Sequence, residues 1–456
     1  MKTVTARIAA TAIVALITGA VTALPASAAT ASITVDGITY TVDDANVSAG
    51  AEVTEYDPGV GGTSPEIDPT VTIGPNTYDV VSIGASAFGA NGLTSVTIPN
   101  SVTTIGYQSF RYNDLESVTI PDSVTTIEAL AFAHNSLASL TIPNSVTTIG
   151  GQAFWDNLLQ EVSIPDTVTT IGGYVFSEND LTSVTIPDSF TSISGGLFWR
   201  NNLESVTIPN GVTSIGETAF AENSLAHVTI PNGVTSIGEG AFWGNSLTSV
   251  AIPASVTFID VVAFFENPLT SVAFEGNAPV MGAAPFGDVG LTNDPLVSYF
   301  ARNAGFTAPT WTAGETEYRS QALATVTFDA NGHGTTPAAV DVVVDDTVSE
   351  PADPTETGYT FDGWFDAATD GNAFAFATPI TEDLTLFAQW SEVVPEPTAT
   401  PAPSPSSTAE VDTEVAVAAG EELADTGATN TGLIWIAGLF LALGAAALAL
   451  RARRTH

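Results

Sequence analysis

Residue types that could support catalysis are few and scattered along this chain. The four histidines, His134, His227, His333 and His456, lie in unrelated segments, and no H-E-x-x-H or comparable metal-binding spacing occurs. There is also no G-x-S-x-G nucleophile elbow and no phosphate-binding loop. The many acidic residues could in principle supply a glycosidase pair, but nearly all occupy variable loop positions or linkers. We therefore expect no catalytic residue, no metal site, no cofactor and no enzymatic activity.

Aromatic residues are better candidates for a binding function. Trp155, Trp199 and Trp243 each follow a phenylalanine of a regular series, and Phe265 holds the same place further on. If the series marks stacked turns of chain, three indoles would stand about 10 Å apart along one edge, because neighbouring strands are about 4.8 Å apart. Exposed indoles at that spacing could stack on sugar rings or anchor a protein interface. The alternative is that they lie over the loops as additional packing, and the sequence leaves both open.

The element that must position these residues is a repeat of 22 residues. It reads L-x-S-V-T-I-P-x-x-V-T-x-I-x-x-x-x-F-x-x-N-x. Such a strict period predicts a coil of stacked turns, each resting on its neighbours. The phenylalanine returns at Phe88, Phe110, Phe132, Phe154, Phe176, Phe198, Phe220, Phe242 and Phe264.

Each turn is too small to fold alone. Six of its positions are apolar, as at Leu93, Val96, Ile98, Val102, Ile105 and Phe110. Burying them contributes roughly 9 to 18 kcal/mol, whereas ordering 22 residues costs roughly 22 to 44 kcal/mol of backbone entropy. Stacking must therefore supply the difference, with the phenylalanines facing inward.

Two polar columns of the repeat have structural interpretations. The proline that begins at Pro99 is expected to end each S-V-T-I strand, because proline has no N–H for the next turn. The asparagine three residues after each phenylalanine is expected at a bend, where its amide satisfies loop backbone groups. The outward serine and threonine rows, such as Ser95 and Thr97, would form a flat hydroxyl ribbon. This ribbon either binds a ligand or only keeps the sheet soluble.

The repeat resembles the BspA-like (Treponema pallidum type) leucine-rich repeat, L-x-x-L-x-L-P-x-x-L-x-x-I-x-x-x-A-F-x-x-C/N, from about Val80 to Phe274. The resemblance implies a curved solenoid on a bacterial or protozoan surface that binds proteins or host matrix. We assign the solenoid to residues 79–274, with about nine turns. Residues 29–78, which read as strands around an Asp36-Gly37 turn, are expected to cap one end. Residues 275–321, with Trp311 and Tyr318, are expected to cap the other.

Residues 322–391 are expected to form a separate small module. The run from Gly358 to Trp364, G-Y-T-F-D-G-W, resembles the InlB B-repeat (Listeria-Bacteroides repeat) domain. This resemblance implies a β-grasp-like fold that acts as a spacer or weak interaction module. Residues 392–422, rich in Pro, Ala, Thr and Glu, cannot build a core and are expected to be a disordered stalk.

The two ends of the chain predict export and anchoring. Residues 1–28 carry Lys2, Arg7, an apolar run and Ala26-Ser27-Ala28, which is typical of a secretory signal peptide. Residues 423–456 contain a short motif, an apolar span at 433–450 that predicts a transmembrane helix, and a basic tail. The motif residues are Leu423, Ala424, Asp425, Thr426 and Gly427.

That order resembles a sortase cell-wall sorting signal of the L-A-x-T-G type. It implies cleavage after Thr426 by sortase, and covalent attachment of Thr426 to peptidoglycan. The protein would then be in the membrane only before sorting, and afterwards in the cell wall of a Gram-positive bacterium. The alternative is a permanent single-span anchor.

Charge and composition exclude several partners. Residues 29–426 hold all 50 acidic residues and four basic ones, a net charge of −46. Nucleic acid and anionic lipid are therefore poor partners. The absence of cysteine excludes disulfides and thiolate zinc sites. Because the only lysine, Lys2, leaves with the signal peptide, lysine crosslinks are excluded and a monomer is expected.

The sequence therefore favours a cell-wall-anchored surface protein that mediates adhesion, or binds a host or bacterial surface protein or glycan, through its repeats. A structural component of a wall coat or biofilm is the alternative. A secreted glycan hydrolase is a remote third possibility, because no acid pair stands out.

Overall fold

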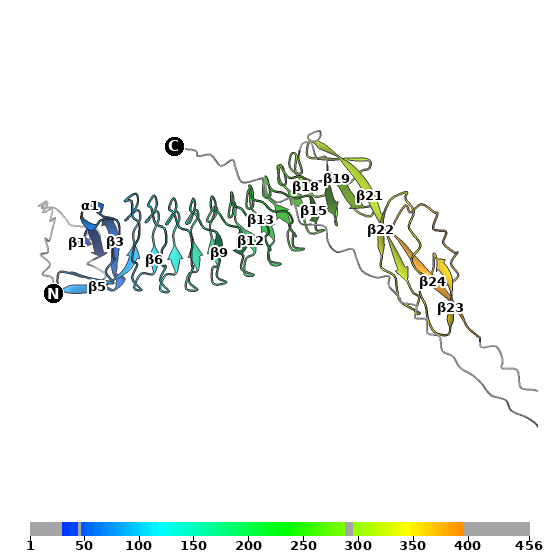
Figure 1. The fold of residues 1–456 in the computed structure, drawn as a ribbon, viewed down its shortest axis with the longest axis horizontal. Helices are drawn as coiled ribbons and strands as arrows, with labels where there is room; N and C mark the ends of the chain where they lie inside the picture. The colour runs from blue at the N-terminus through cyan, green and yellow to red at the C-terminus, as the bar shows by residue number, and fades with distance from the viewer. Residues whose placement is uncertain (1–29, 44–46, 288–294, 395–456) are drawn as a thin grey trace, which may run out of the picture. The chain divides into compact units, whose positions relative to one another are not determined.

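The computed structural model describes residues 30–43, 47–287 and 295–394. Regular structure in these residues is almost entirely β-strand, as expected, and α1 (Pro58–Gly61) is a helix of 4 residues. Most of the described chain winds into a coil of about 11 turns (Figure 1). The signal peptide, the stalk beyond residue 394, the sortase motif and the apolar span 433–450 lie outside the described residues.

Five strands precede the first complete repeat. They are β1 (Thr30–Val35), β2 (Ile38–Asp43), β3 (Ala51–Tyr56), β4 (Thr70–Ile73) and β5 (Asn76–Ile83), with a short 3-10 helix, η1 (Val47–Ala49), before β3. The predicted Asp36-Gly37 turn joins β1 to β2 in an antiparallel pair. The end of β5 pairs in parallel with the first strand of the repeats. Tyr56 covers the outer face of Phe88, with ring centroids 5.0 Å apart.

The phenylalanine column forms the centre of the coil. All nine predicted side chains are fully buried. Each ring stacks on the next, at centroid distances from 5.1 Å for Phe88 and Phe110 to 6.0 Å for Phe176 and Phe198. The prediction that this column faces inward is confirmed.

In most turns the strand follows the proline, whereas the prolines were predicted to end a strand that precedes them. The regular ladder uses the two residues that end at the isoleucine after the proline, as in Thr104–Ile105, and runs in parallel from turn to turn. Its strands are β6 (Thr104–Ile105), β7 (Thr126–Ile127), β8 (Thr148–Ile149), β10 (Thr170–Ile171), β12 (Ser192–Ile193), β13 (Ser214–Ile215), β14 (Ser236–Ile237), β16 (Phe258–Ile259) and β18 (Val280–Met281).

The S-V-T-I segment, which was predicted to be the strand of every turn, pairs in only some of the described turns. Strands occur there at β9 (Glu161–Ser163), β11 (Ser183–Thr185), β15 (Ser249–Ile252) and β17 (Ser271–Phe274). In turns without such pairing the central valine is only partly buried, as at Val96 and Val118. The proline instead opens a tight turn, in which the Val102 N–H donates to the Pro99 carbonyl at 3.1 Å.

The segment around each phenylalanine uses left-handed backbone at two fixed positions. The second residue before and the second after Phe88 have φ of 58° and 55°, and the later described turns repeat this. Left-handed conformation costs a non-glycine residue roughly 1 to 2 kcal/mol. It lets alternate amides point along the coil, so that the N–H groups of Ser86, Phe88 and Ala90 each donate to the next turn at 2.8 Å.

The asparagine column satisfies loop backbone groups, as predicted, and it also joins consecutive turns. Asn113 Nδ2 donates to the carbonyls of Phe88 at 2.8 Å and Phe110 at 3.0 Å, while its Oδ1 accepts from the Leu93 N–H at 2.9 Å. The same pattern recurs from Asn135 through Asn267. The side chains therefore satisfy backbone groups that no strand partner reaches.

One interruption divides the regular ladder. β10 and β12 belong to different sheets, so Ile171 and Ile193 are not paired. In the turn that contains β12, Phe190 replaces the valine of the other repeats and is buried. The same neighbourhood has the widest phenylalanine spacing, 6.0 Å. A larger side chain in a close-packed interior separates its neighbours, and this accounts for the gap.

The coil continues beyond the nine turns that were predicted. Phe286 keeps the period and stacks on Phe264 at 5.7 Å, although the proline and asparagine positions of its turn are lost. β19 (Leu296–Phe300) then pairs in parallel with β17 and with the long strand β21 (Thr316–Asp329). Tyr318 packs edge-on against Phe286 at 5.7 Å. The estimate of nine turns was therefore too low, because it required the whole repeat pattern.

A second small core follows. β21 pairs with β20 (Thr310–Ala313), β22 (Val340–Val343) and β24 (Leu384–Glu392), and β23 (Tyr359–Phe365) pairs with β24. Trp364 and Phe328 lie in this core, with ring centroids 4.9 Å apart. Because β21 is continuous through residue 321, backbone pairing crosses the expected boundary between cap and module.

No helix in the described part of the chain is long and apolar enough to cross a membrane.

Candidate binding edge of the repeats

The three tryptophans lie along one edge of the coil, and each is half-buried. The indole Nε1 atoms of Trp199 and Trp243 are buried without a hydrogen-bond partner. The Trp243 side chain leaves the backbone next to Gly240. A Cβ placed on this glycine would be 3.6 Å from the Cβ of Trp243. These two rings therefore lie against the loops, with their polar atoms turned away from water. Phe265 is also half-buried.

Trp199 belongs to a packed group with Tyr174 and Arg200. The two rings meet edge-on at 6.0 Å, and the Arg200 guanidinium lies 4.4 Å from the Trp199 ring centroid. Tyr174 covers Gly196, where an added Cβ would be 2.2 Å from a ring carbon. Arg200 also contacts Glu178 at 3.7 Å and Glu222 at 3.0 Å, one on each neighbouring turn. Charge and packing are thus satisfied within this group.

Trp155 belongs to a more exposed group nearer the N-terminus. Its ring is 4.5 Å from that of His134, which stacks on Tyr112 at 4.3 Å with an interplanar angle of 7°. His134 Nδ1 contacts Asp156 Oδ2 at 2.7 Å. Because a carboxylate only accepts, the ring donates from Nδ1. Tyr112 is 52% exposed, so this part of the edge presents an aromatic surface to solvent.

Arg111, beside Tyr112, differs from Arg200. Its guanidinium lies 4.4 Å from the Tyr112 ring centroid, and Nη2 donates to the Tyr112 hydroxyl at 3.0 Å. No carboxylate of the described residues lies within 4.0 Å of it, and its buried Nε has no partner there. Tyr107, in the same turn, is 44% exposed.

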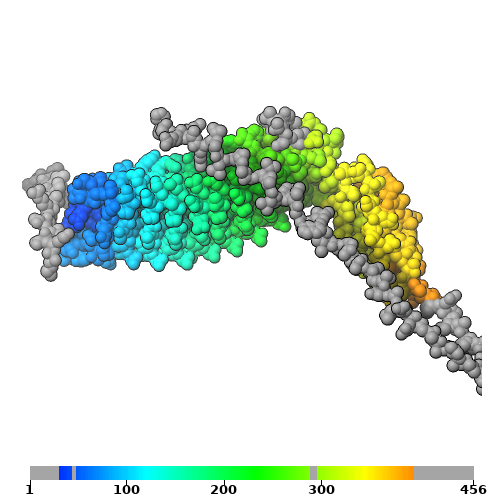
Figure 2. Space-filling view, viewed as in Figure 1, coloured from blue at the N-terminus to red at the C-terminus, as the bar shows by residue number. Residues whose placement is uncertain are grey.

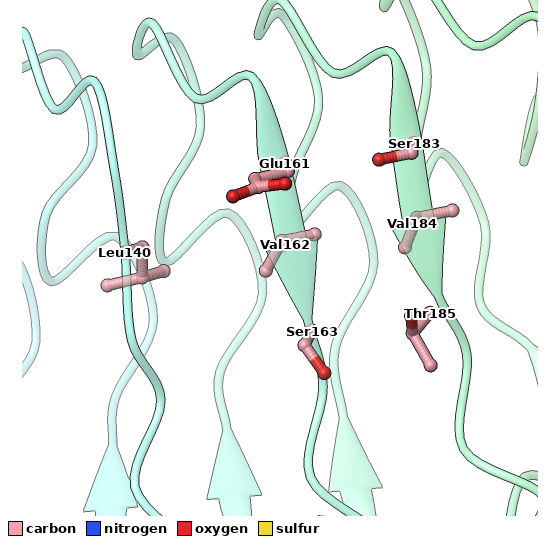
Figure 3. A pocket seen from close by; sticks show the side chains of 7 residues that line it. All are labelled: Leu140, Glu161, Val162, Ser163, Ser183, Val184 and Thr185. Carbon is pink, nitrogen blue, oxygen red and sulfur yellow. The ribbon is translucent and has the colours of Figure 1, made fainter.

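The hydroxyl ribbon is exposed, as predicted, and His227 within it is exposed too. A shallow pocket of about 290 Å³ lies on this ribbon, where Leu140 of one turn is followed by the paired strands β9 and β11 (Figure 3). Glu161, Ser163, Ser183 and Thr185 supply its polar atoms. Figure 3 shows the Glu161 and Ser183 side chains projecting from adjacent strands. Such a pocket can offer hydroxyl and carboxylate contacts to a ligand.

The titratable groups with shifted pKa values lie in structural positions. Burial raises the pKa of Tyr40 to about 12, and its hydroxyl accepts from the Asp68 N–H at 3.1 Å. Burial, with Asp36 and Glu66 nearby, raises the pKa of Asp68. Neither group lies on the tryptophan edge. Within the described residues no group of three or more His, Asp or Glu side chains could hold a metal ion.

Sequence reasoning did not select Arg111, Tyr112, His134 or Tyr174 as binding candidates; the fold brings His134 and Tyr174 against tryptophans, and Tyr112 against His134. They occupy variable positions, and only the columns of the repeat could have suggested them. Leu423, Ala424, Asp425, Thr426 and Gly427 lie outside the described residues.

Comparisons with known proteins agree with this fold. Residues 81–203 and 191–296 match the BspA type leucine rich repeat region, and residues 325–389 match the Listeria-Bacteroides repeat domain. Internalin H of Listeria monocytogenes is 44% identical over 69 residues, which are 15% of this chain and 12% of that protein.

Two solved structures are also similar. A leucine-rich repeat protein from Bacteroides ovatus is 27% identical, with a TM-score of 0.49 over 58% of this chain and 70% of that one. A leucine rich cell surface protein from Faecalibacterium prausnitzii is 25% identical, with a TM-score of 0.36 over 56% of this chain and 72% of that one. By its sequence matches, the chain carries BspA-type leucine-rich repeats followed by a Listeria-Bacteroides repeat domain, as both sequence resemblances predicted.

Proposed function

We propose that this protein is a non-enzymatic surface protein that mediates adhesion, or binds a protein or glycan, through the outer columns of its repeats. The observation that supports this proposal is the packed interior of the coil. The phenylalanines are fully buried and the asparagines satisfy loop backbone groups, so the coil has a packed interior along the turns that the structure describes. What the coil offers is an exterior on which residues 22 apart in sequence become neighbours (Figure 2).

Binding is assigned to the edge that carries Trp155, Trp199, Trp243 and Phe265. Trp155 stands in the exposed aromatic group, whereas Trp199 and Trp243 support the loops from which that edge is built. The triple variant Trp155→Ala, Trp199→Ala, Trp243→Ala tests the edge. Loss of binding to cells or glycans by folded protein is expected. Unchanged binding by a folded triple variant would exclude the edge.

The proposal includes export, sortase cleavage after Thr426 and covalent attachment to peptidoglycan. It rests on the order of motif, apolar span and basic tail in the sequence. Mass spectrometry of the protein released from cell walls is the direct test. A mature chain that begins at Ala29 and ends at Thr426 is expected, and any other C-terminal residue counts against sortase.

The net charge over residues 29–426 and the lack of lysine there support a monomer that does not bind nucleic acid. The partner that the protein binds distinguishes adhesion from a structural function in the wall or biofilm. Pull-down with host matrix proteins and with isolated bacterial wall distinguishes an adhesin from a structural wall or biofilm component. Capture by host material supports adhesion, and capture by wall alone supports the structural alternative.

A further inference from the structure

The pocket on the hydroxyl ribbon lies where the repeat departs from its own pattern. Leu140 replaces the valine that all other copies of the S-V-T-I segment have, and Glu161 is the only acid in the serine and threonine rows. Pairing between turns also changes here, because β9 pairs with β11 while β10 and β12 of the same two turns do not pair. Since the rest of the ribbon repeats one polar surface, these departures mark a specific site.

β9 and β11 hold the polar side chains of this pocket in two pairs. In their parallel register Ser183 lies beside Glu161, and Thr185 lies beside Ser163. The edge of β9 that faces Leu140 is not paired, because β9 and β11 form a sheet of two strands (Figure 3). In the part of the chain that the structure describes, the Glu161 carboxylate has no ion pair, and neither this carboxylate nor the three hydroxyls make a hydrogen bond. These four groups are therefore available to a ligand.

The remaining lining of the pocket is apolar. Leu140 and Val184 are half-buried and Val162 is buried, so methyl groups form the floor. The volume of about 290 Å³ is close to the lower limit of roughly 300 Å³ for small-molecule sites. No aromatic side chain lines the pocket, so it lacks the ring face on which a sugar stacks. The pocket therefore suits one flexible side chain with an apolar stem and a polar end.

The free carboxylate selects the kind of side chain. Glu161 can only accept hydrogen bonds, and the large negative charge of the chain favours a cationic donor. A lysine ammonium has three donors and no acceptor, and its four-carbon stem lies readily along apolar surface. One carboxylate with adjacent hydroxyls satisfies these three donors. An arginine guanidinium spreads five donors in one plane and stacks on aromatic faces, which this pocket does not offer.

We propose that this pocket binds a lysine side chain of a partner protein, with the stem on Leu140 and Val184 and the ammonium beside Glu161 and Ser183. The lysine must come from another protein, since residues 29–426 of this chain contain none. A divalent cation does not fit, because no group of three or more acidic or histidine side chains among the described residues could hold one. The pocket lies on the ribbon and not on the tryptophan edge, so this inference goes beyond the proposed function.

The test uses the whole chain from residue 29 to residue 426 and a short capped peptide of glycine and serine with one central lysine. Matched peptides carry norleucine, Nε-acetyllysine or arginine instead. Methyl NMR signals of Leu140 and Val184 report binding in the pocket, and the lysine peptide should shift both to saturation. The norleucine and Nε-acetyllysine peptides should bind at least about fivefold more weakly, since a hydrogen bond between charged groups exceeds a neutral contact. The arginine peptide should also bind more weakly than the lysine peptide.

Glu161→Gln is expected to weaken binding of the lysine peptide by at least about fivefold and to leave the norleucine peptide unaffected. Glu204→Gln is the matched control, because Glu204 is exposed and carries the same charge but does not line the pocket. It should keep the affinity within about twofold. Leu140→Val restores the valine of the other copies, and by reducing the apolar floor it should weaken both peptides. Circular dichroism verifies that the variants are folded.

The absence of a saturable shift at the Leu140 and Val184 methyl groups would overturn the proposal. So would equal binding of the norleucine peptide, tighter binding of the arginine peptide, or an affinity that Glu161→Gln leaves unchanged. Larger shifts of the same signals by a neutral oligosaccharide would also overturn it, because the pocket would then be a sugar site. The triple tryptophan variant should bind the lysine peptide as the wild-type chain does, so failure at the tryptophan edge and failure at this pocket are distinguishable.

Discussion

Replacing one asparagine of the inner column should destabilise the coil by a calculable amount. Asn201 makes four hydrogen bonds to backbone groups. Its Oδ1 accepts from the Leu181 N–H at 3.0 Å, and its Nδ2 donates to the carbonyls of Phe176, Phe198 and Trp199 at 2.9, 3.2 and 3.3 Å. Asn201→Ala removes all four without changing the surface, because Asn201 is 6% exposed.

The three carbonyls keep other donors. The Phe176 carbonyl still accepts from Asn179, that of Phe198 from Asn223, and that of Trp199 from the Glu178 N–H. The buried Leu181 N–H is therefore the only group left without a partner. An unsatisfied buried donor costs about 1 to 3 kcal/mol, and the lost bonds to shared carbonyls add about 1 kcal/mol together. We expect Asn201→Ala to lower the free energy of unfolding by roughly 2 to 4 kcal/mol.

The adjacent residue is the matched control. Asn202 is exposed and makes one side-chain hydrogen bond to Asp180 at 3.3 Å, so Asn202→Ala should cost less than about 0.5 kcal/mol. Urea unfolding followed by circular dichroism gives both values, and hydrogen exchange at the Leu181 amide locates the damage. A change at Asn201 no larger than that at Asn202, with Leu181 still protected, would refute the structural role of the column.

Three further substitutions test local features. Phe190→Val should let β10 and β12 pair as their neighbours do, and hydrogen exchange should then show increased protection of the Thr191 amide; unchanged protection would contradict the wedge explanation. Gly196→Ala should destabilise the coil by more than 1 kcal/mol beyond Gly240→Ala. Both glycines have left-handed φ, 61° and 57°, but only Gly196 lies under the Tyr174 ring, and equal thermal shifts would reject that contact. Burial opposes ionisation of Asp383, but hydrogen bonds from the Thr325 N–H and the Arg302 guanidinium outweigh it and lower the pKa of this carboxyl. Its stabilisation should thus be complete above about pH 4 and decline as pH falls through the folded-state pKa. Asp383→Asn should remove that dependence from melting curves between about pH 2 and 7, and an unaltered curve would contradict it.

The interior of the coil was predictable from the sequence because it is set by side-chain type at a fixed period. Phenylalanine and asparagine recur every 22 residues over nine turns. In these turns the phenylalanine fills the core and the asparagine hydrogen-bonds to the loop backbone. The tenth phenylalanine, Phe286, was not counted because its turn lacks the proline and the asparagine of the repeat. At this end of the coil, the 22-residue spacing of the buried phenylalanine alone predicts the additional turn, whereas the complete repeat motif does not.

The strand positions were harder to predict, since two segments of each turn alternate polar and apolar residues. Both S-V-T-I and the T-x-I segment after the proline satisfy the strand pattern. The T-x-I segment pairs along the coil except at the gap beside Phe190, whereas the S-V-T-I segment pairs only at β9–β11 and at β15–β17. The left-handed positions were also hidden, because residues as different as Tyr112, His134 and Glu178 occupy them.

The candidate binding edge was only partly predictable. The spacing of the tryptophans placed them on one edge, but their orientation depends on neighbours from other turns. Gly196 leaves space for the Tyr174 ring, which meets Trp199 edge-on, and the His134 ring contacts Trp155 from the preceding turn. Such contacts join residues about one period apart, and no local pattern shows them.

The most direct test of the stacked coil is a set of distances between residues in one column. Because the chain has no cysteine, spin labels can be placed uniquely by substitution of exposed serines with cysteine. Ser95→Cys is paired in turn with Ser139→Cys, Ser205→Cys and Ser249→Cys, which lie two, five and seven turns away. Double electron–electron resonance should give distances between the two spin labels that grow by roughly 5 Å per turn, to about 25 Å at five turns and about 35 Å at seven. Distances that do not increase with the number of turns would contradict the coil, and with it the edge on which binding is proposed.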